Sequence, residues 1–129
     1  MPAVLLAEPV ATVPANVLLE QLQRDGIRTP RLAEVRDYVQ RYPDIIPVMQ
    51  HACTLSVAEF AGKAGLSLEV YVDPEIADPY LTLYVQKEGY DPATSQVIEN
   101  IFATYAEGMT NSAAWMMVMQ DYRGASQDV

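Results

Sequence analysis

Two side chains in this sequence could act as a base and a nucleophile, because His51 and Cys53 are its only histidine and its only cysteine. A thiol activated by an imidazole is a common nucleophile in acyl-transfer enzymes. The two residues are two positions apart in a segment of helical period, and such positions on a helix point in roughly opposed directions. The sequence therefore predicts no dyad. Cys53 falls on the apolar side of the helix, and His51 is the one candidate general base.

Three carboxylates, Asp73, Glu75 and Asp78, occur within six positions. Oxygen-rich loops of this kind can bind calcium or magnesium, but this one lacks the spacing and the central glycine of an EF-hand loop. Asp73 and Asp78 each precede a proline, and Asp-Pro pairs are ordinary turn formers. A structural turn is the favoured interpretation. The alternative is a metal site, or a small enzyme or ligand-binding site that combines these carboxylates with His51.

No sequence motif points to a cofactor, since the chain contains no P-loop, dinucleotide-binding glycine motif, GxSxG or HExxH. The 17 acidic and 8 basic residues give a formal net charge of −9, which opposes binding to nucleic acid and to anionic membranes. One cysteine cannot form an intramolecular disulfide, which is typical of a reducing compartment. Residues 1–13 lack the basic region of a signal peptide, and no apolar run reaches the about 18 residues of a membrane span. We expect a cytoplasmic protein.

Tyrosine is unusually frequent, with eight tyrosines against two phenylalanines. Alternation in a predicted hairpin places Tyr71, Tyr80 and Tyr84, together with Glu69, on its polar face. Tyrosine combines a large apolar ring with a polar tip and loses little rotamer entropy, so protein interfaces favour it. Two interpretations stay open. These residues form a binding face for another protein, or they form cross-strand pairs that only stabilise the hairpin.

A β-hairpin predicted over residues 66–86 positions these residues. Apolar and polar residues alternate along both of its arms. The apolar face carries seven aliphatic side chains: Leu66, Leu68, Val70, Val72, Leu81, Leu83 and Val85. Such a face requires a cover, so we expect helices to lie across it.

Three helices are expected before the hairpin, over residues 14–25, 30–41 and about 45–63. Gly26 ends the first of them. Thr29 is the predicted N-cap of the second helix and Asp44 that of the third, because each stands just before a proline-containing first turn.

One helix and one strand are expected after the hairpin. Asp91 is the predicted cap of the helix, Pro92 its first residue, and Gly108 closes it. The continuous apolar run 114–120 is typical of a strand covered on both sides. If the helix is a crossover, this last strand can pair in parallel with the second arm of the hairpin.

Together these elements predict an α+β fold in a single domain, residues 1–129, in the order α-α-α-β-β-α-β. The sheet has about three strands, with helices packed on its apolar face. Residues 1–13 are expected to form a loose arm, and residues from 124 onward a loose tail.

Part of the sequence resembles a group of small uncharacterised bacterial proteins. The resemblance rests on LSLEVYVDPEIADPYLTLYV, with RYPDIIPVM before it and AWMMVMQDYR after it, and it covers about half the chain. Those proteins carry a similar leucine-rich strand, DPE turn and second strand. The resemblance implies a shared fold and a role as a companion subunit, such as the neutralising half of a toxin–antitoxin pair. It includes no catalytic signature, and no functional residue carries over.

The sequence therefore favours a non-catalytic, acidic protein-interaction module that binds a protein partner through Tyr71, Tyr80, Tyr84 and Glu69. The alternative is a small enzyme or ligand-binding domain that uses His51 with the carboxylates of residues 73–78. Neither a metal nor a cofactor is expected for the favoured function.

Overall fold

A computed structural model describes residues 15–72, 75, 78–87 and 91–121 of the chain. The predicted loose arm and tail, and Asp73, lie outside these residues. In chain order the elements are α2 (Ala15–Arg24), β1 (Ile27–Arg28), α3 (Leu32–Arg41), the short 3-10 helix η1 (Pro43–Ile45), α4 (Ile46–Phe60), β2 (Gly65–Tyr71), β3 (Tyr80–Gln86), α5 (Pro92–Tyr105), the 3-10 helix η2 (Ala106–Met109) and β4 (Met116–Asp121).

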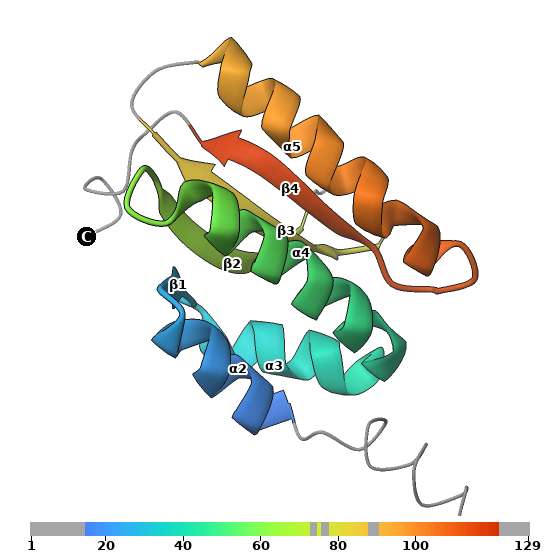
Figure 1. Ribbon diagram of the computed structural model, residues 1–129. Helices are drawn as coiled ribbons and strands as arrows, with labels where there is room; N and C mark the ends of the chain where they lie inside the picture. The colour runs from blue at the N-terminus through green and yellow to red at the C-terminus, as the bar shows by residue number, and fades with distance from the viewer. Residues whose placement is uncertain (1–14, 73–74, 76–77, 88–90, 122–129) are drawn as a thin grey trace, which may run out of the picture.

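The strands form one sheet in the order β1-β2-β3-β4. β2 and β3 are the predicted antiparallel hairpin, in which Leu68 lies opposite Leu83. β4 pairs in parallel with β3, and α5 is the crossover between them (Figure 1). The predicted α+β class, the hairpin and the parallel last strand are confirmed.

The sheet has four strands rather than the predicted three, because β1 was not foreseen. This strand has only two residues, and it pairs in parallel with the start of β2, so that Ile27 lies beside Leu66. Gly26 precedes it with a φ of 100°, a left-handed conformation that glycine adopts readily. Two residues are too few to show an alternation in the sequence, so only the pairing defines this strand.

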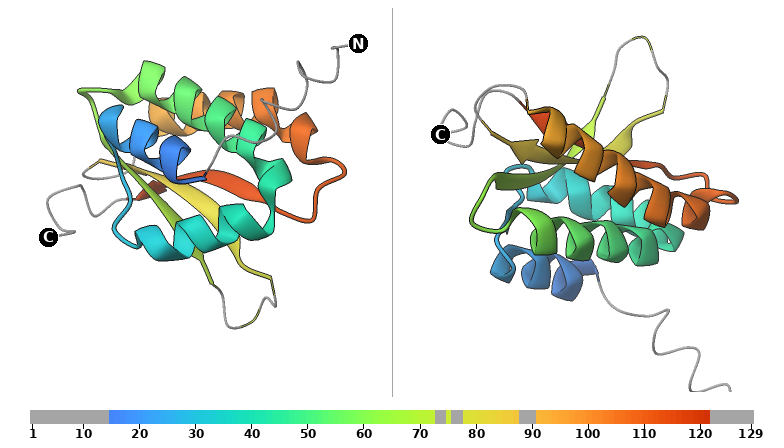
Figure 2. Two further views of the ribbon diagram at one scale, coloured as in Figure 1. Left: turned by 90° about the horizontal axis from the view of Figure 1, so that it is seen from below. Right: turned by 45° about the horizontal axis from the view of Figure 1, so that its top comes forward.

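The described helices cover one face of the sheet and leave the other without a helix (Figure 2). α3 packs against β2, α4 against β2 and β4, and α5 against β4. The strand residues under these helices belong to one hydrophobic core, and they are Leu66, Leu68, Leu81, Leu83, Val85, Met116 and Val118. The predicted packing of helices on the apolar face is confirmed.

Two of the three predicted N-caps are wrong. Arg31 precedes α3 and makes no capping hydrogen bond with its side chain, while the Thr29 hydroxyl accepts a hydrogen bond from Gln23 Nε2 at 2.6 Å. Asp44 lies inside η1 rather than at a helix start. A turn at residues 30 and 31 separates Thr29 from the start of α3, and η1 takes up the residues at which the third helix was predicted to begin. Asp91 caps α5 as predicted.

Val72 was predicted on the core face but lies beyond the end of β2, with 67% of its surface exposed. Its neighbour Val70 is partly buried against the core. Tyr71 is the last residue of β2 that pairs with β3. The alternation of apolar and polar residues in the sequence continues one residue further, to Val72. Side-chain alternation alone therefore overestimates the length of this strand.

Candidate interaction face of the sheet

The face of the sheet that carries no helix gathers aromatic, methionine and polar side chains. They come from β2, β3 and β4 and alternate with the core residues along each strand. We call this surface the tyrosine face and define it by Glu69, Tyr71, Tyr80, Thr82, Tyr84, Met117 and Met119.

The strand register arranges these residues in rows across the sheet. The central row joins Glu69, Thr82 and Met117. In the row on one side of it, Tyr84 stands between Ser67 and Met119. In the row on the other side, Tyr71 lies opposite Tyr80. Thr82 is therefore at the centre of the tyrosine face.

The three predicted tyrosines share this face, and none of them lies beneath a helix. The rings of Tyr71 and Tyr80 are in contact, with centroids 5.2 Å apart and planes at 41°. Tyr71 is 36% exposed, while Tyr80 and Tyr84 are half-buried. Partial burial, and next the negative charge of Glu69, raise the pKa of the Tyr84 phenol above its ordinary value. The structure thus brings the four predicted residues together, and their role in binding stays a prediction.

Glu69 and Thr82 form the polar centre of the tyrosine face. The Ser67 hydroxyl donates a hydrogen bond to Glu69 Oε2 at 3.0 Å, which holds this half-buried carboxylate in place. Thr82 has no exposed surface, although no helix covers it. Its hydroxyl oxygen makes no hydrogen bond with any residue that the structure describes.

Three apolar residues of β4 and its approach were not predicted for this site. Met117 and Met119 belong to the tyrosine face, and Met119 is 42% exposed. Trp115, which is 43% exposed, borders the face, and its Nε1–H points to the sulfur of Met117 at 3.0 Å. The sequence predicted a strand over 114–120 but covered on both sides. Pairing with β3 followed by simple alternation would have placed residues 117 and 119 beside the tyrosines.

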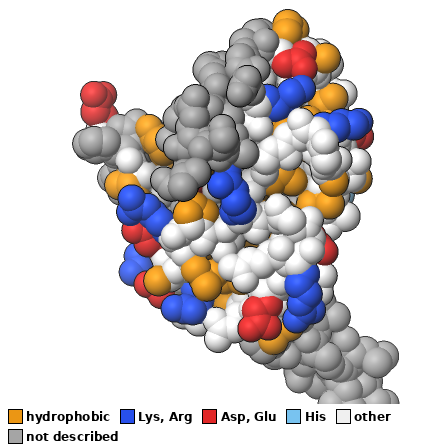
Figure 3. Space-filling view, turned by 90° about the vertical axis from the view of Figure 1, so that its left-hand side faces the viewer, with side chains coloured by type: hydrophobic (Ala, Val, Ile, Leu, Met, Phe, Trp, Pro, Cys, Tyr) orange, Lys and Arg blue, Asp and Glu red, His pale blue; other side chains and the backbone are white. Residues whose placement is uncertain are grey.

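Charge is distributed unevenly along the chain. Residues 45–121, which supply α4, α5 and the three long strands, include ten acidic residues and two basic ones. Five of the eight basic residues are arginines of the segment 24–41. Figure 3 shows one side of the molecule, where basic side chains lie beside acidic ones rather than in a patch of their own. Segment 45–121, with the three long strands, α4 and α5, is therefore the acidic part of the protein.

The residues considered for catalysis do not form a site. His51 is exposed on α4 and makes no hydrogen bond or ion pair with the described residues. Cys53 is fully buried, and burial raises the pKa of its thiol to about 12. Glu75 and Asp78 are exposed. Among the described residues no group of three His, Cys, Asp or Glu side chains could hold a metal ion.

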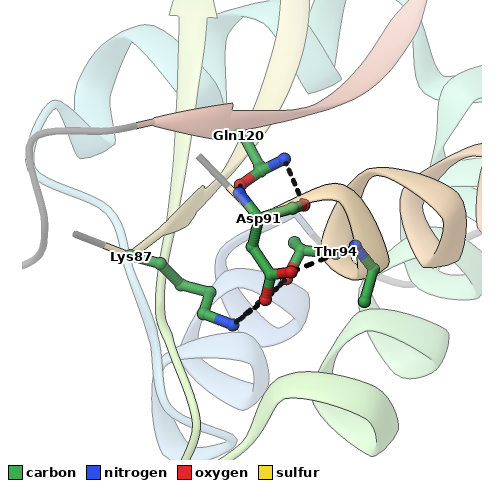
Figure 4. Close-up of polar contacts among 5 residues, drawn as sticks. Lys87, Asp91, Thr94 and Gln120 are labelled. Atoms are coloured by element: carbon green, nitrogen blue, oxygen red, sulfur yellow. Dashed lines mark hydrogen bonds and ion pairs between the residues drawn. The ribbon is translucent and has the colours of Figure 1, made fainter. Parts of the chain in front are cut away.

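Asp91 is the centre of a polar cluster at the start of α5 (Figure 4). Its carboxylate accepts hydrogen bonds from Lys87 Nζ at 2.8 Å, from the Thr94 hydroxyl at 3.0 Å and from the Ala93 N–H at 3.0 Å. These contacts, that of Lys87 first, lower the pKa of Asp91 to about 2. The Gln120 side chain bonds to both the N–H and the C=O of Asp91 at 3.3 Å. The cluster therefore fixes α5 to the end of β4 and is structural.

Comparison with known proteins adds no assignment, since no protein-family model, curated protein or solved structure matches the chain. The described part of the chain includes no helix that is long and apolar enough to cross a membrane. The interpretation of the tyrosine face therefore depends on its own geometry.

Proposed function

We propose that this protein is a non-catalytic, acidic interaction module that binds another protein through the tyrosine face. The observation that carries this proposal is the position of the three tyrosines on the sheet face opposite the helices. A tyrosine that only filled the core would lie between the helices and the sheet, as the buried Tyr105 of α5 does in the hydrophobic core.

The composition of the face supports this function. Large hydrophobic side chains that are exposed in the described part of the chain are Val17, Tyr71, Val72, Trp115 and Met119. Three of these five lie on the tyrosine face or at its border. Tyrosine, tryptophan and methionine are enriched at the cores of protein interfaces, where aromatic rings supply large contact areas at a small cost in entropy.

The chemistry of the remaining residues agrees with a non-catalytic role. The buried Cys53 thiol is not a nucleophile at physiological pH, and His51 has no described partner to orient it. We propose a role as a companion subunit of the antitoxin type, whose target is a protein rather than nucleic acid. We also propose a cytoplasmic location, because a fold with one buried thiol needs no oxidising compartment.

The test is a binding titration with a partner captured from the source cell, then identified and purified. Tyr71→Ala and Tyr84→Ala are compared with the unchanged protein after circular dichroism has shown that each is folded. Loss of an anchoring tyrosine is expected to cost about 2 kcal/mol or more, which is about thirtyfold in affinity.

Val17→Ala is the matched control, because Val17 is an exposed apolar residue of α2, on the helical side of the protein. It is expected to leave affinity unchanged. Unchanged binding in both tyrosine variants would reject the proposal. A turnover that is lost in His51→Ala would favour the enzyme interpretation instead.

A further inference from the structure

A pocket of about 250 Å³ lies between α3 and the end of β2, two elements that are in contact. The α3 residues that line it recur at intervals of three or four, at positions 34, 37, 38 and 41. Such positions share one side of a helix. From β2 the pocket is lined by Val70, a residue of the core face that alternates with Glu69 and Tyr71. The pocket is therefore a site apart from the tyrosine face.

Much of the lining of this pocket is apolar or aromatic. Tyr38 and Tyr42 supply two rings that are in contact, with centroids 5.0 Å apart. Val70, the exposed Val72 and Pro79 supply aliphatic surface beside these rings. Long basic side chains cover such surface with their methylene stems and keep their charged groups in water. The lining therefore suits the stem of a lysine or an arginine.

Two carboxylates also line the pocket, and both are exposed to solvent. Glu34 forms an ion pair with Arg31 at 3.5 Å, so the charges of these two residues offset each other. Asp37 makes no hydrogen bond and no ion pair with the described residues. Its carboxylate is therefore available to a cation that enters the pocket.

The charges around the pocket favour a cation. Burial is the main cause of the raised pKa of the Tyr38 phenol, and the nearby carboxylates of Asp44 and Asp78 add to it. Arg41 is the one basic residue among the described residues that line the pocket. It is exposed at the end of α3, where a side chain of its length can turn outward. With Asp37, three carboxylates therefore act against one guanidinium group, and this balance attracts a positive charge.

The size of the pocket matches one side chain rather than a small molecule. Sites for small molecules usually have volumes of about 300–1,000 Å³, which exceed the 250 Å³ of this pocket. Among the described residues no group of three His, Cys, Asp or Glu side chains could hold a metal ion. A second copy of the chain carries the same net charge of −9, and charge of one sign keeps proteins apart. A basic residue of a different protein fits both the volume and the charge.

We propose that this pocket binds a lysine or arginine side chain of a partner protein, with its stem on Val70 and Tyr42 and its charged group at Asp37. This inference goes beyond the proposed function, because it assigns a second binding site that uses no residue of the tyrosine face. The partner segment that enters the pocket is basic, and the net charge of −9 attracts such a segment over a distance.

The probe for the test is a random peptide library displayed on phage and selected on the intact, immobilised protein. The selected peptides are synthesised, and their dissociation constants are measured by fluorescence anisotropy. One class of peptides is expected to contain a lysine or an arginine and to bind the Tyr84→Ala variant like the unchanged protein. Replacing that basic residue by norleucine keeps an aliphatic stem but removes the charge, and it is expected to weaken binding about threefold to fivefold.

Two variants of α3 are expected to change the affinity for these peptides in opposite directions. Asp37→Asn removes the carboxylate and should weaken binding about threefold to fivefold. Arg41→Gln removes the opposing cation and should strengthen binding by a similar factor. Neither should change the urea midpoint, because Asp37 and Arg41 are exposed and make no ion pair with the described residues. Arg36→Gln is the matched control, since Arg36 belongs to α3 but does not line this pocket, and it should change affinity less than either.

The outcomes separate this inference from the proposed function. Peptides that are weakened by Tyr84→Ala alone would overturn the basic pocket and keep the tyrosine face as a binding surface. Peptides that are weakened by Asp37→Asn and strengthened by Arg41→Gln would support the pocket whatever the tyrosine face does. Basic peptides that respond to neither α3 variant, or a library that yields no peptide, would count against the pocket. A dimer in sedimentation that Asp37→Asn dissociates would overturn the choice of partner, because a second copy would then occupy the pocket.

Discussion

The main-chain N–H of Trp115 donates a hydrogen bond to the hydroxyl oxygen of Tyr38 at 3.0 Å, between residues 77 positions apart. Tyr38 belongs to α3, which packs against β2, and Trp115 directly precedes β4. The bond thus connects a helix at one side of the sheet with the residue that borders the tyrosine face at the other. It positions the one tryptophan of the chain beside Met117.

Removing this hydroxyl group is expected to loosen the start of β4. Tyr38→Phe should lower the free energy of unfolding by about 1 kcal/mol, because the Trp115 N–H loses its acceptor. Urea melts followed by the fluorescence of Trp115 measure the change. Tyr42→Phe is the control, since the Tyr42 hydroxyl group has no hydrogen bond with described residues, and it should be close to neutral. Equal losses in the two variants would show that the bond contributes nothing.

The two faces of the hairpin should differ in their sensitivity to truncation. Leu83 is completely buried in the core, so Leu83→Ala should cost roughly 2–5 kcal/mol. Thr82→Ala, on the helix-free face, should cost well under half of that, because it removes one methyl group and a hydroxyl group that has no hydrogen-bond partner among the described residues. Urea melts of both variants decide the question, and a larger loss for Thr82→Ala would mean that the tyrosine face is the true core face.

The stability of the protein should fall in acid partly through Asp91. Its pKa in the folded state, about 2, lies below the ordinary 3.8. The folded state therefore gains stability from the ionised carboxylate above about pH 4, and this gain is lost as the pH falls from about 4 towards 2. Chemical denaturation of the unchanged protein and of Asp91→Asn at pH 6, 4, 3 and 2 should give curves that converge at the lowest pH.

Lys87→Met provides an independent check of this cluster. The Lys87 ammonium group makes the largest contribution to the lowered pKa of Asp91. An NMR titration of the Asp91 carboxyl group should therefore show a higher pKa in the variant than in the unchanged protein. A pKa that stays the same would remove Lys87 as its cause.

Cys53 should be chemically inert while the protein is folded. The thiol is completely buried, and its pKa of about 12 leaves almost no thiolate at pH 8. Labelling with a thiol reagent at pH 8 should be slow without denaturant and rapid in concentrated urea. The labelling rate across a urea series should follow the unfolded fraction. Rapid labelling of the native protein would contradict the buried position of α4 in the core.

Local patterns in the sequence determined the elements whose signals are contained within a few residues. The alternation of the hairpin arms defined both strands, because successive side chains of a strand point to opposite faces. Asp91 before Pro92 defined the start of α5, because a cap and a first-turn proline act within one helical turn. The grouping of Tyr71, Tyr80, Tyr84 and Glu69 on one face followed from the same alternation.

The tertiary structure decided what depends on residues far apart in the chain. Ile27 and Arg28 form a strand only because residues 66 and 67 lie beside them. Met117 and Met119 join the tyrosine face only through the parallel register of β4 with β3. A two-residue strand and an unalternating apolar run carry too little local signal to choose a partner or a face. The partner strand of β1 and the faces of the β4 side chains are set by pairing with strands that are distant in the chain, and local sequence patterns do not indicate this pairing.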